Sequence, residues 1–354
     1  MNAAHRAMPT FSILFFSDVR NDVSDADKYM FMRDTAMFAD REGFTAIYFP
    51  ERHFHEFGSV YPNQAVVASW LVPQTRNIRF RTAGVSLPLH HPAEIVEWWS
   101  MVDVLSGGRV DLGFGSGWSK ADFILSPANY DDRRAIMSER IELVRRLWRG
   151  EEIAFPGPGG ALTTIRCFPR PIQKEIAVWL LVAQNDQSFH FAGAAGYNVF
   201  TMLYGYDLEQ LAAKIRIYRN ARREAGHDPE GGIVSLMLHT FVRDSSDAVR
   251  RVVERPFRQY IASTVDAHLA ARARDGGRTA QVTEEEKRRI LDYSFHRYYR
   301  SCTLFGTVDE CKDVVDQAIA AGVNDIACLV DFGVDYGTVM DALPFLKSVV
   351  SSYG

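Results

Sequence analysis

The chain has 354 residues, 47% of them hydrophobic, and a formal net charge of −4. That is enough apolar material for a large core, and α/β barrels of this size often form one domain. The small negative charge gives no reason to expect a nucleic acid or an anionic membrane as partner, and no apolar run approaches the roughly 18 residues of a membrane span.

Neither the N-terminal segment nor the cysteines indicate secretion. Met1 to Thr10 lacks the apolar core of a secretory signal, so residues 1–10 are predicted to be a disordered lead-in. The four cysteines form no CxxC pair and predict buried thiols in a reducing cytoplasm. They are Cys167, Cys302, Cys311 and Cys328.

Eight strand-like runs, most of them almost continuously apolar, alternate with helix-like segments. Such runs are typical of a parallel sheet covered on both faces. The runs are Phe11 to Ser17, Ala46 to Phe49, Ile78 to Leu87, Arg109 to Gly113, Ala177 to Ala183, Asn198 to Leu203, Val234 to Val242, and Asp325 to Asp331. The clearest helices are Ala26 to Glu42, Pro92 to Leu105, Arg134 to Trp148, and Asp309 to Ala321. This alternation predicts one α/β domain over residues 1–354, a (β/α)8 TIM barrel.

The longest segment that a minimal eight-stranded barrel does not require is Pro256 to Arg300, after the seventh strand. Long insertions of this kind are commonly lids, and we expect a lid here. Thr283 and Glu286 have the spacing of a capping box that opens a short helix.

Charged and imidazole groups follow the second predicted strand, at Glu51, Arg52, His53 and His55. Ligands of parallel α/β folds bind at the carboxyl ends of strands, and an imidazole can move protons near neutral pH. The alternative is a polar loop with solvated charges. His53 and His55, two residues apart, would point to opposite sides of an extended segment, so we expect no metal site.

Three further strand ends carry candidate ligand contacts. In the third strand, Ala83 and Gly84 are small, which allows close approach of a flat ligand or marks a bulge. The fourth ends in glycines before Ser116, which can bring backbone N–H groups to a phosphate or simply make a tight turn. The fifth is followed by Asn185 and Ser188, which either cap the next helix alone or hold an anion at its start.

These residues together resemble the bacterial luciferase-like, flavin-dependent monooxygenases over roughly residues 11–350. The order and spacing of several loose signatures carry the resemblance. They are Glu51 to Gly58, Thr82 to Pro88, Asp103 to Val110, Arg134 to Met137 with Glu139, and Gly306 to Glu310.

The resemblance implies reduced FMN at the carboxyl ends of the strands. Ala83 and Gly84 match a pair joined by a cis peptide that backs the flavin ring, and Arg134 matches an arginine that holds the phosphate. Asp122 matches an acidic residue near the flavin. The cofactor-binding residues expected on this basis are Ala83, Gly84, Ser116, Asp122, Arg134, Ala183, Gln184, Asn185 and Ser188.

The chain departs from luciferase itself at the second strand. Two adjacent histidines stand there in luciferase, and the first acts as the base; here that position is Arg52, and His53 remains. We therefore expect Arg52, His53 and His91 to be the catalytic residues. Arg52 would stabilise an oxygen-derived anion, although an ion pair with Glu51 or Glu56 is the alternative.

The resemblance therefore predicts a two-component monooxygenase. A partner reductase would supply reduced FMN, and the substrate would be a small or carrier-bound intermediate, as in relatives that accompany polyketide and peptide synthetases. Alternatives are an F420-dependent hydride-transfer enzyme and a flavin-binding protein without oxygenase activity. Surplus apolar bulk on Ala26 to Glu42 and Pro92 to Leu105 predicts a homodimer. Phe31, Met32, Met37, Trp98, Trp99 and Met101 provide it.

Overall fold

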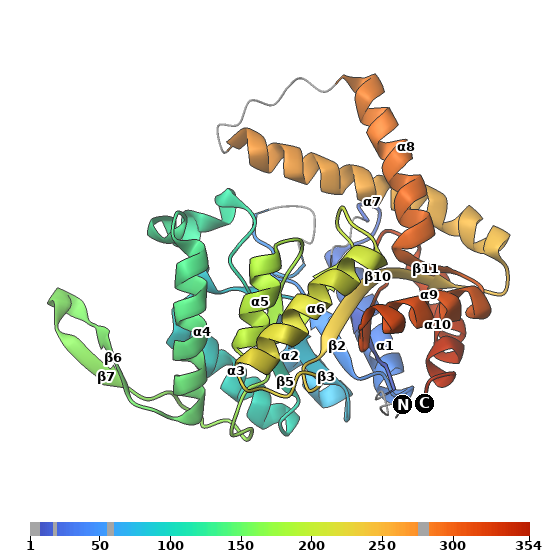
Figure 1. Ribbon diagram of the computed structural model, residues 1–354. Coiled ribbons are helices and arrows are strands. Elements are labelled where there is room, and N and C mark those ends of the chain that lie inside the picture. Colours follow the sequence, from blue (N-terminus) through green and yellow to red (C-terminus); the bar gives the residue numbers. More distant parts are fainter. Residues whose placement is uncertain (1–7, 17–19, 55–59, 275–282) are drawn as a thin grey trace.

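The computed structural model describes residues 8–16, 20–54, 60–274 and 283–354 (Figure 1). Residues 1–7 of the predicted lead-in therefore lie outside the described residues, and so does His55. Among the described residues, each helix is too short or too polar to cross a membrane.

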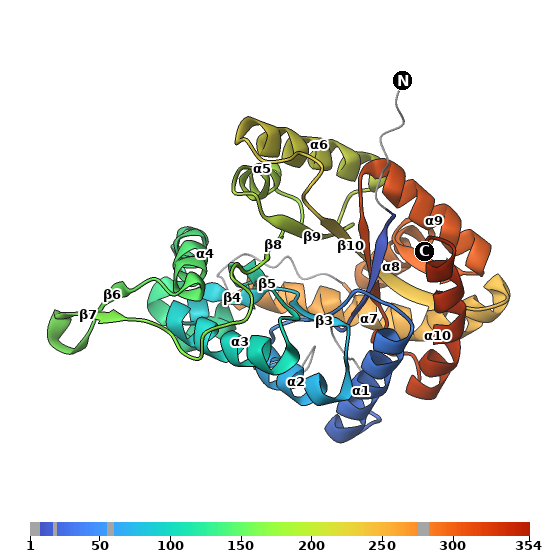
Figure 2. The ribbon, with the colours of Figure 1, turned by 90° about the horizontal axis from the view of Figure 1, so that it is seen from below.

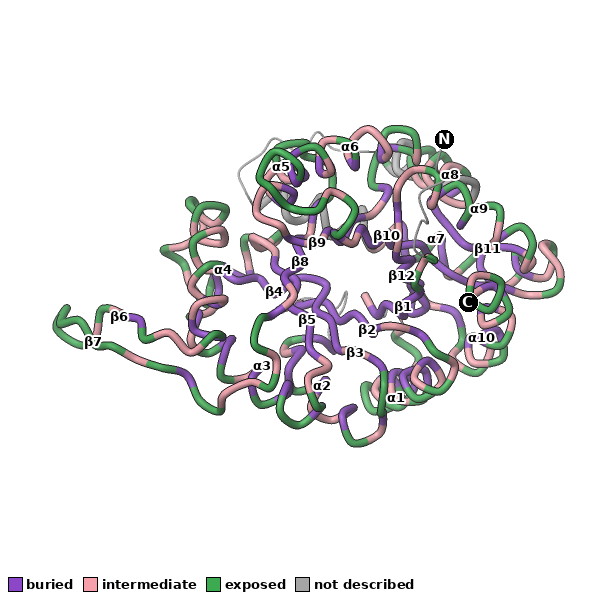
Figure 3. The backbone as a smooth tube through the Cα atoms, turned by 60° about the horizontal axis from the view of Figure 1, so that its bottom comes forward, coloured by how far each residue is buried: buried purple, intermediate pink, exposed green. Residues whose placement is uncertain are grey.

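Eight parallel strand positions close into a barrel, as predicted (Figure 2). Around the barrel the order is β1, β2, β3 with β4, β5, β8, β9, β10 and β12, and β12 pairs back with β1. Their bounds are Thr10–Leu14, Ala46–Phe49, Arg79–Thr82, Val85–Ser86, Val110–Gly115, Val178–Leu181, Asn198–Met202, Val234–Val242 and Asp325–Leu329. The strands are buried almost throughout, because the barrel interior covers one face and helices cover the other (Figure 3).

Helices surround the barrel, and local signals explain where they begin and end. They are α1 Asp25–Arg41, α2 Gln64–Leu71, α3 Pro92–Ser106, α4 Arg133–Arg149, α5 Asp186–Ala194, α6 Leu208–Glu224, α9 Val308–Ala321 and α10 Tyr336–Ser351. Thr307 and Glu310 form a capping box at the start of α9. Gly150 ends α4 in the left-handed conformation at φ 93°, which only glycine adopts at little cost.

The insertion predicted as a lid consists of two helices, α7 Ser246–Arg274 and α8 Glu284–Ser301, on the side where the barrel strands end (Figure 1). The helix predicted at Thr283 is thus longer than expected, at 18 residues. Strand β11 Thr303–Gly306 was not predicted; it extends the sheet beside the end of β10. The connection after α4 forms a projecting hairpin of β6 Ile153–Pro156 and β7 Leu162–Ile165, two strands that were not predicted.

Near the residues where β5, β10 and β12 begin, the barrel holds a buried polar network, which we call the floor network. Its members are Tyr48, Arg81, Asp111, Ser235 and Asp325. Arg81 lies 2.9 Å from Asp111 and 3.7 Å from Asp325, and its Nη1 donates to the Tyr48 hydroxyl at 2.8 Å. Each member is hydrogen-bonded or ion-paired to another member. The network therefore holds β2, β3, β5, β10 and β12 together inside the barrel.

Candidate active site

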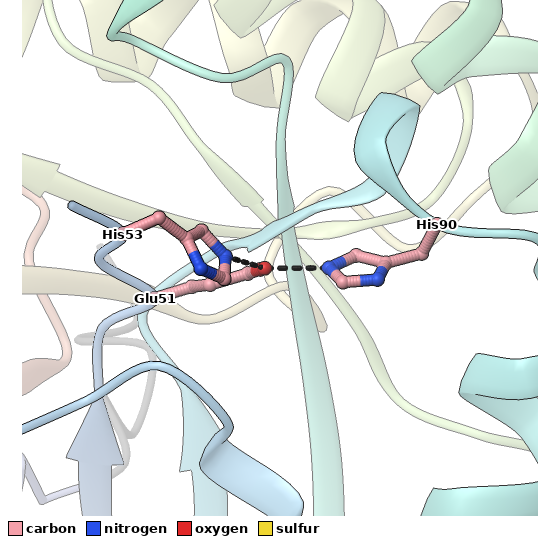
Figure 4. Close-up of side chains that lie close together, drawn as sticks. All are labelled: Glu51, His53 and His90. Atoms are coloured by element: carbon pink, nitrogen blue, oxygen red, sulfur yellow. Dashed lines mark hydrogen bonds and ion pairs between the residues drawn. The ribbon is translucent and has the colours of Figure 1, made fainter. Parts of the chain in front are cut away.

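Two histidines converge on one carboxylate at the mouth of the barrel, where the strands end. Glu51 follows β2, His53 lies two residues further, and His90 follows β4 and the short turn after it. Nε2 of His53 lies 2.8 Å from Glu51 Oε1, and Nε2 of His90 lies 2.5 Å from the same oxygen (Figure 4). We call Glu51, His53 and His90 the mouth triad.

Glu51 is held in its ionised form. Its side chain is 3% exposed, and burial by itself opposes the charge. Hydrogen bonds from His53 and His90, together with one from the Ser86 backbone N–H at 2.6 Å, outweigh burial and lower the pKa of Glu51 to about 2. The same carboxylate overcomes the burial of His53 and raises the pKa of that imidazole above its usual range.

Arg52 and Asp122 lie beside the triad. The Arg52 guanidinium packs over the Phe16 ring at 4.6 Å and over the Trp118 ring at 5.0 Å. Burial lowers the pKa of Arg52 to about 10, although Tyr260, Asp122 and Asp331 oppose the fall. Glu51 bonds the two histidines, while Glu56, the other ion-pair partner weighed for Arg52, lies outside the described residues.

Asp122 is the acidic residue that the family pattern placed near the flavin. It lies on the short 3-10 helix η3, Lys120–Leu125, and is buried. Burial raises the pKa of Asp122 to about 6, and the positive charges of His53 and Arg52 moderate that rise. A carboxyl with such a pKa changes its charge close to neutral pH.

His91 lies outside the mouth triad. It is the N-cap of α3, where its Nδ1 accepts a hydrogen bond from the Ala93 N–H at 3.2 Å, and its ring packs against Phe155 at 4.7 Å. Sequence reasoning missed its neighbour His90, which bonds Glu51. One signal was available: Pro92 after His91 favours the first helical position, which makes His91 the cap.

Small residues of neighbouring strand ends contact one another beside the triad. A Cβ on Gly84 would lie 3.3 Å from Leu181 and 3.7 Å from the Gly115 backbone nitrogen, so β4, β5 and β8 meet there. The expected cis peptide between Ala83 and Gly84 is absent. Among the described residues the cis bond is Phe168–Pro169, and Gly84 makes the bend with φ 105°, which glycine can adopt.

Four of the residues predicted to bind the cofactor lie at the start of α5. They are Ala183, Gln184, Asn185 and Ser188. Asn185 caps α5 by accepting the Gln187 N–H at 2.9 Å, and Ser188 lies half-buried in its first turn. Ala183 and Gln184 are exposed before it, and their backbone carbonyls accept from Tyr206 and Lys214.

Ser116 and Arg134 lie on the connection after β5 and on helix α4, which follows it. Ser116 is half-buried directly beyond the end of β5, and Arg134 is exposed in the first turn of α4. No distance in the structure ties either residue to the start of α5, so their shared role is a prediction.

Comparison with known proteins identifies the family. The family model described as luciferase-like monooxygenase matches residues 9–325. The chain belongs to this family. It is accordingly a flavin-dependent monooxygenase with the barrel fold that its sequence predicts.

Relatives of this luciferase-like protein are distant in sequence. It is 25% identical over 312 residues to the oxygenase component of the flavin-dependent trigonelline monooxygenase of Acinetobacter baylyi, covering 86% of this chain and 84% of that one. Monooxygenase RslO1 from Streptomyces bottropensis shares the fold with a TM-score of 0.82 and 22% identity, covering 98% of this chain and 100% of that one.

A third similar structure holds a flavin. It is the oxygenating constituent of 3,6-diketocamphane monooxygenase from the CAM plasmid of Pseudomonas putida, in complex with FMN. The TM-score is 0.75 at 18% identity, covering 98% of this chain and 97% of that one. At this identity the likeness establishes the fold alone.

Proposed function

We propose that this luciferase-like protein is the oxygenase component of a two-component system, which takes reduced FMN from a partner reductase. The observation that carries the proposal is the barrel mouth, where Gly84 and Gly115 lie at strand ends that also carry the half-buried Arg52 and the imidazoles of His53 and His90. The relative named as an oxygenase component supports the partner. When bound, reduced FMN activates O2 and delivers one oxygen atom to a substrate.

The residues at the mouth fit such a cofactor. Gly84 and Gly115 carry no side chain of their own, and the Leu181 side chain lies beside both, so a flat ring would pack against a surface of glycine backbone and leucine. Asn185 and Ser188 at the start of α5 suit a phosphate, since the N-terminus of a helix favours an anion. Arg134, exposed in the first turn of α4, would add a charge-assisted hydrogen bond if its side chain reaches that phosphate.

The chain would contribute positioning, charge and a proton. Arg52 places a fixed cation in a site lined by Phe16 and Trp118, where little water weakens its field. It would therefore stabilise an anion that develops on oxygen. His53, whose raised pKa keeps it protonated to higher pH than a free imidazole, would hold or give a proton.

We also propose a class of substrate and a dimeric assembly. The substrate would be a small or carrier-bound intermediate, with a role in secondary metabolism, as the sequence resemblance suggests. A homodimer would cover exposed apolar side chains on neighbouring helices α1, α2 and α3, which are Met30, Met37, Val66, Met101, Val104 and Leu105. Of the six residues first named for this surface, Phe31, Met32 and Trp99 are buried instead.

The test is oxygen-18 incorporation. The protein is combined with FMN, a generic NADH-dependent reductase, labelled O2 and a panel of thioester substrates. Label in a product, dependent on both the reductase and the protein, supports the proposal. Arg52→Met should release hydrogen peroxide in place of labelled product. Tight binding of F420 with no affinity for reduced FMN would replace the proposal with hydride transfer, and flavin binding without label on any substrate would favour a binding protein.

A further inference from the structure

One imidazole inside the barrel has no polar partner. His239 lies on β10, and only 8% of the residue is exposed. Its Nε2 atom is buried and has no hydrogen-bond partner among the residues that the structure describes. Buried polar atoms of proteins are almost always hydrogen-bonded, so this exception calls for an explanation, and a bound molecule is one.

The position of His239 along β10 places it near the mouth of the barrel. Side chains alternate along a strand, so His239 shares a face with Ser235, whose hydroxyl joins the floor network inside the barrel. The intervening strand carries the chain about 13 Å further towards its carboxyl end. The His239 side chain therefore points into the barrel beyond the floor network, on the side of the candidate active site.

Aromatic rings enclose this imidazole. The rings of Tyr260 and Phe257 from α7 lie 4.7 Å and 4.9 Å from the His239 ring, and all three contacts are edge to face when Phe332, at 5.8 Å after β12, is included. We call Phe257, Tyr260 and Phe332 the aromatic cage. Such rings pack well against a flat aromatic molecule, but their faces give only weak hydrogen bonds. Tyr260 also acts on the charge of Arg52, so the cage borders the candidate active site.

The imidazole of His239 is uncharged. Burial lowers the pKa of His239 to about 3, so the ring is neutral at ordinary pH. One nitrogen of a neutral imidazole donates and the other accepts, and the hydrogen can lie on either. A hydroxyl group both donates and accepts, so it pairs with Nε2 in either tautomer. A carboxylate or an ammonium group would instead lie uncompensated among apolar rings, which is unfavourable.

Helix α7 covers the cage and has a weak turn beside it. Pro256 lies inside α7, directly before Phe257. Proline has no backbone N–H, so residue 256 cannot donate a hydrogen bond to the carbonyl of Val252. The segment that carries Phe257 and Tyr260 can therefore turn away from His239 at a lower cost than an uninterrupted helix would require.

We propose that His239 is a substrate-recognition residue, which pairs through Nε2 with the hydroxyl group of a neutral aromatic compound held by the aromatic cage. The end of the substrate that enters the barrel is thus flat, uncharged and hydroxylated. That the bound compound is the one oxygenated rests on the proposed function, whereas its binding does not.

The test measures binding to the full-length, flavin-free protein by ligand fluorescence. The probes are 2-naphthol, naphthalene, which lacks the hydroxyl, and 2-naphthoate, which is charged. The wild type should bind 2-naphthol about ten-fold or more tightly than either, because a ligand without the hydroxyl leaves Nε2 unpaired. His239→Leu should lose the preference for 2-naphthol over naphthalene. His227→Gln, which changes an exposed histidine after α6, is the control and should keep it.

A second measurement separates recognition from a structural role. Replacing an unpaired buried imidazole by an apolar side chain removes a desolvation cost, so His239→Leu should unfold in urea at the wild-type midpoint or above it. A variant that unfolds earlier or does not fold would overturn the proposal, because His239 would then be structural.

The binding data can overturn the proposal in three further ways. These are no saturable binding of 2-naphthol, equal or tighter binding of naphthalene or 2-naphthoate by the wild type, and an unchanged preference in His239→Leu. The assay needs no flavin, so binding through His239 without oxygen-18 label in any product would reject the proposed function and leave the recognition site standing.

Discussion

The barrel buries carboxylates in two places with opposite consequences. In the floor network, Asp111 and Asp325 surround Arg81, whose guanidinium keeps its proton at any ordinary pH. In the mouth triad, Glu51 bonds two imidazole rings in place of a guanidinium, and it raises the pKa of one of them, His53. The same fold thus fixes charge at one end of its strands and leaves it adjustable at the other, which matches the division of TIM barrels into a stabilising and a reactive face.

The largest effect on stability should come from the floor. Asp325 is fully buried, and its carboxylate accepts from the hydroxyls of Ser12 and Ser235 and lies near Arg81. Removing one partner of a buried charged network costs about 3–5 kcal/mol, because it leaves other charges uncompensated. Asp325→Asn should therefore lower the free energy of unfolding by about 3 kcal/mol, measured by urea denaturation. A loss below about 1 kcal/mol would mean that the floor is not a stability element.

Substitution of Arg134 should change ligand affinity and not stability. Arg134→Ala removes a charge-assisted hydrogen bond worth roughly 1.5–3 kcal/mol, so anaerobic titration should show reduced FMN binding about ten-fold or more weaker. Arg216→Ala, an exposed arginine of α6, is the matched control and should bind reduced FMN as the wild type does. Equal affinity of all three proteins would exclude Arg134 from the phosphate site.

The pH dependence of stability should separate Asp122 from Glu51, the buried carboxyl of the mouth triad. Its pKa is raised to about 6 from an ordinary value of 3.8, so the folded protein binds this proton more tightly than the unfolded chain. Stability due to Asp122 is therefore lost as pH rises from about 4 to 6. Asp122→Asn should remove that slope and stabilise the protein at pH 7 by about 1 kcal/mol, after allowance for partial solvent screening.

A difference curve between the two proteins checks this sign. The wild type should lose stability relative to Asp122→Asn across that window. Glu51, with its pKa lowered to about 2, acts in the opposite direction and reduces stability only as pH falls from about 4.5 to 2. A difference that is flat from pH 4 to 6 would contradict the raised pKa of Asp122.

The smallest effect is expected at His91, which the sequence placed beside His53 in catalysis. His91→Gln removes the N-cap of α3 and should lower the free energy of unfolding by about 0.5–1 kcal/mol, with the titration of His53 unchanged. His53→Gln should instead slow turnover and shift its pH profile. Equal losses of turnover in the two variants would instead support a catalytic role for His91.

The sequence predicted what depends on periodicity and missed what depends on three-dimensional contact. Continuous apolar runs located the eight barrel strands, and the position of Asn185 predicted the cap of α5. The short strand β11 gave no separate signal, because its four residues gain their pairing only beside β10. Likewise Pro92 marks His91 as the helix cap, but no local signal brings His90 to Glu51, 39 residues earlier, because that contact depends on how the strands pair.

A crystal structure of the protein with FMN is the most direct test of the account. We predict flavin density at the carboxyl ends of the strands, with the ring against Gly84 and Gly115, the phosphate near Asn185, Ser188 and Arg134, and the mouth triad close to the ring. Flavin bound elsewhere on the molecule, or a mouth that stays empty at saturating FMN, would contradict the assignment of this end of the barrel as the active site.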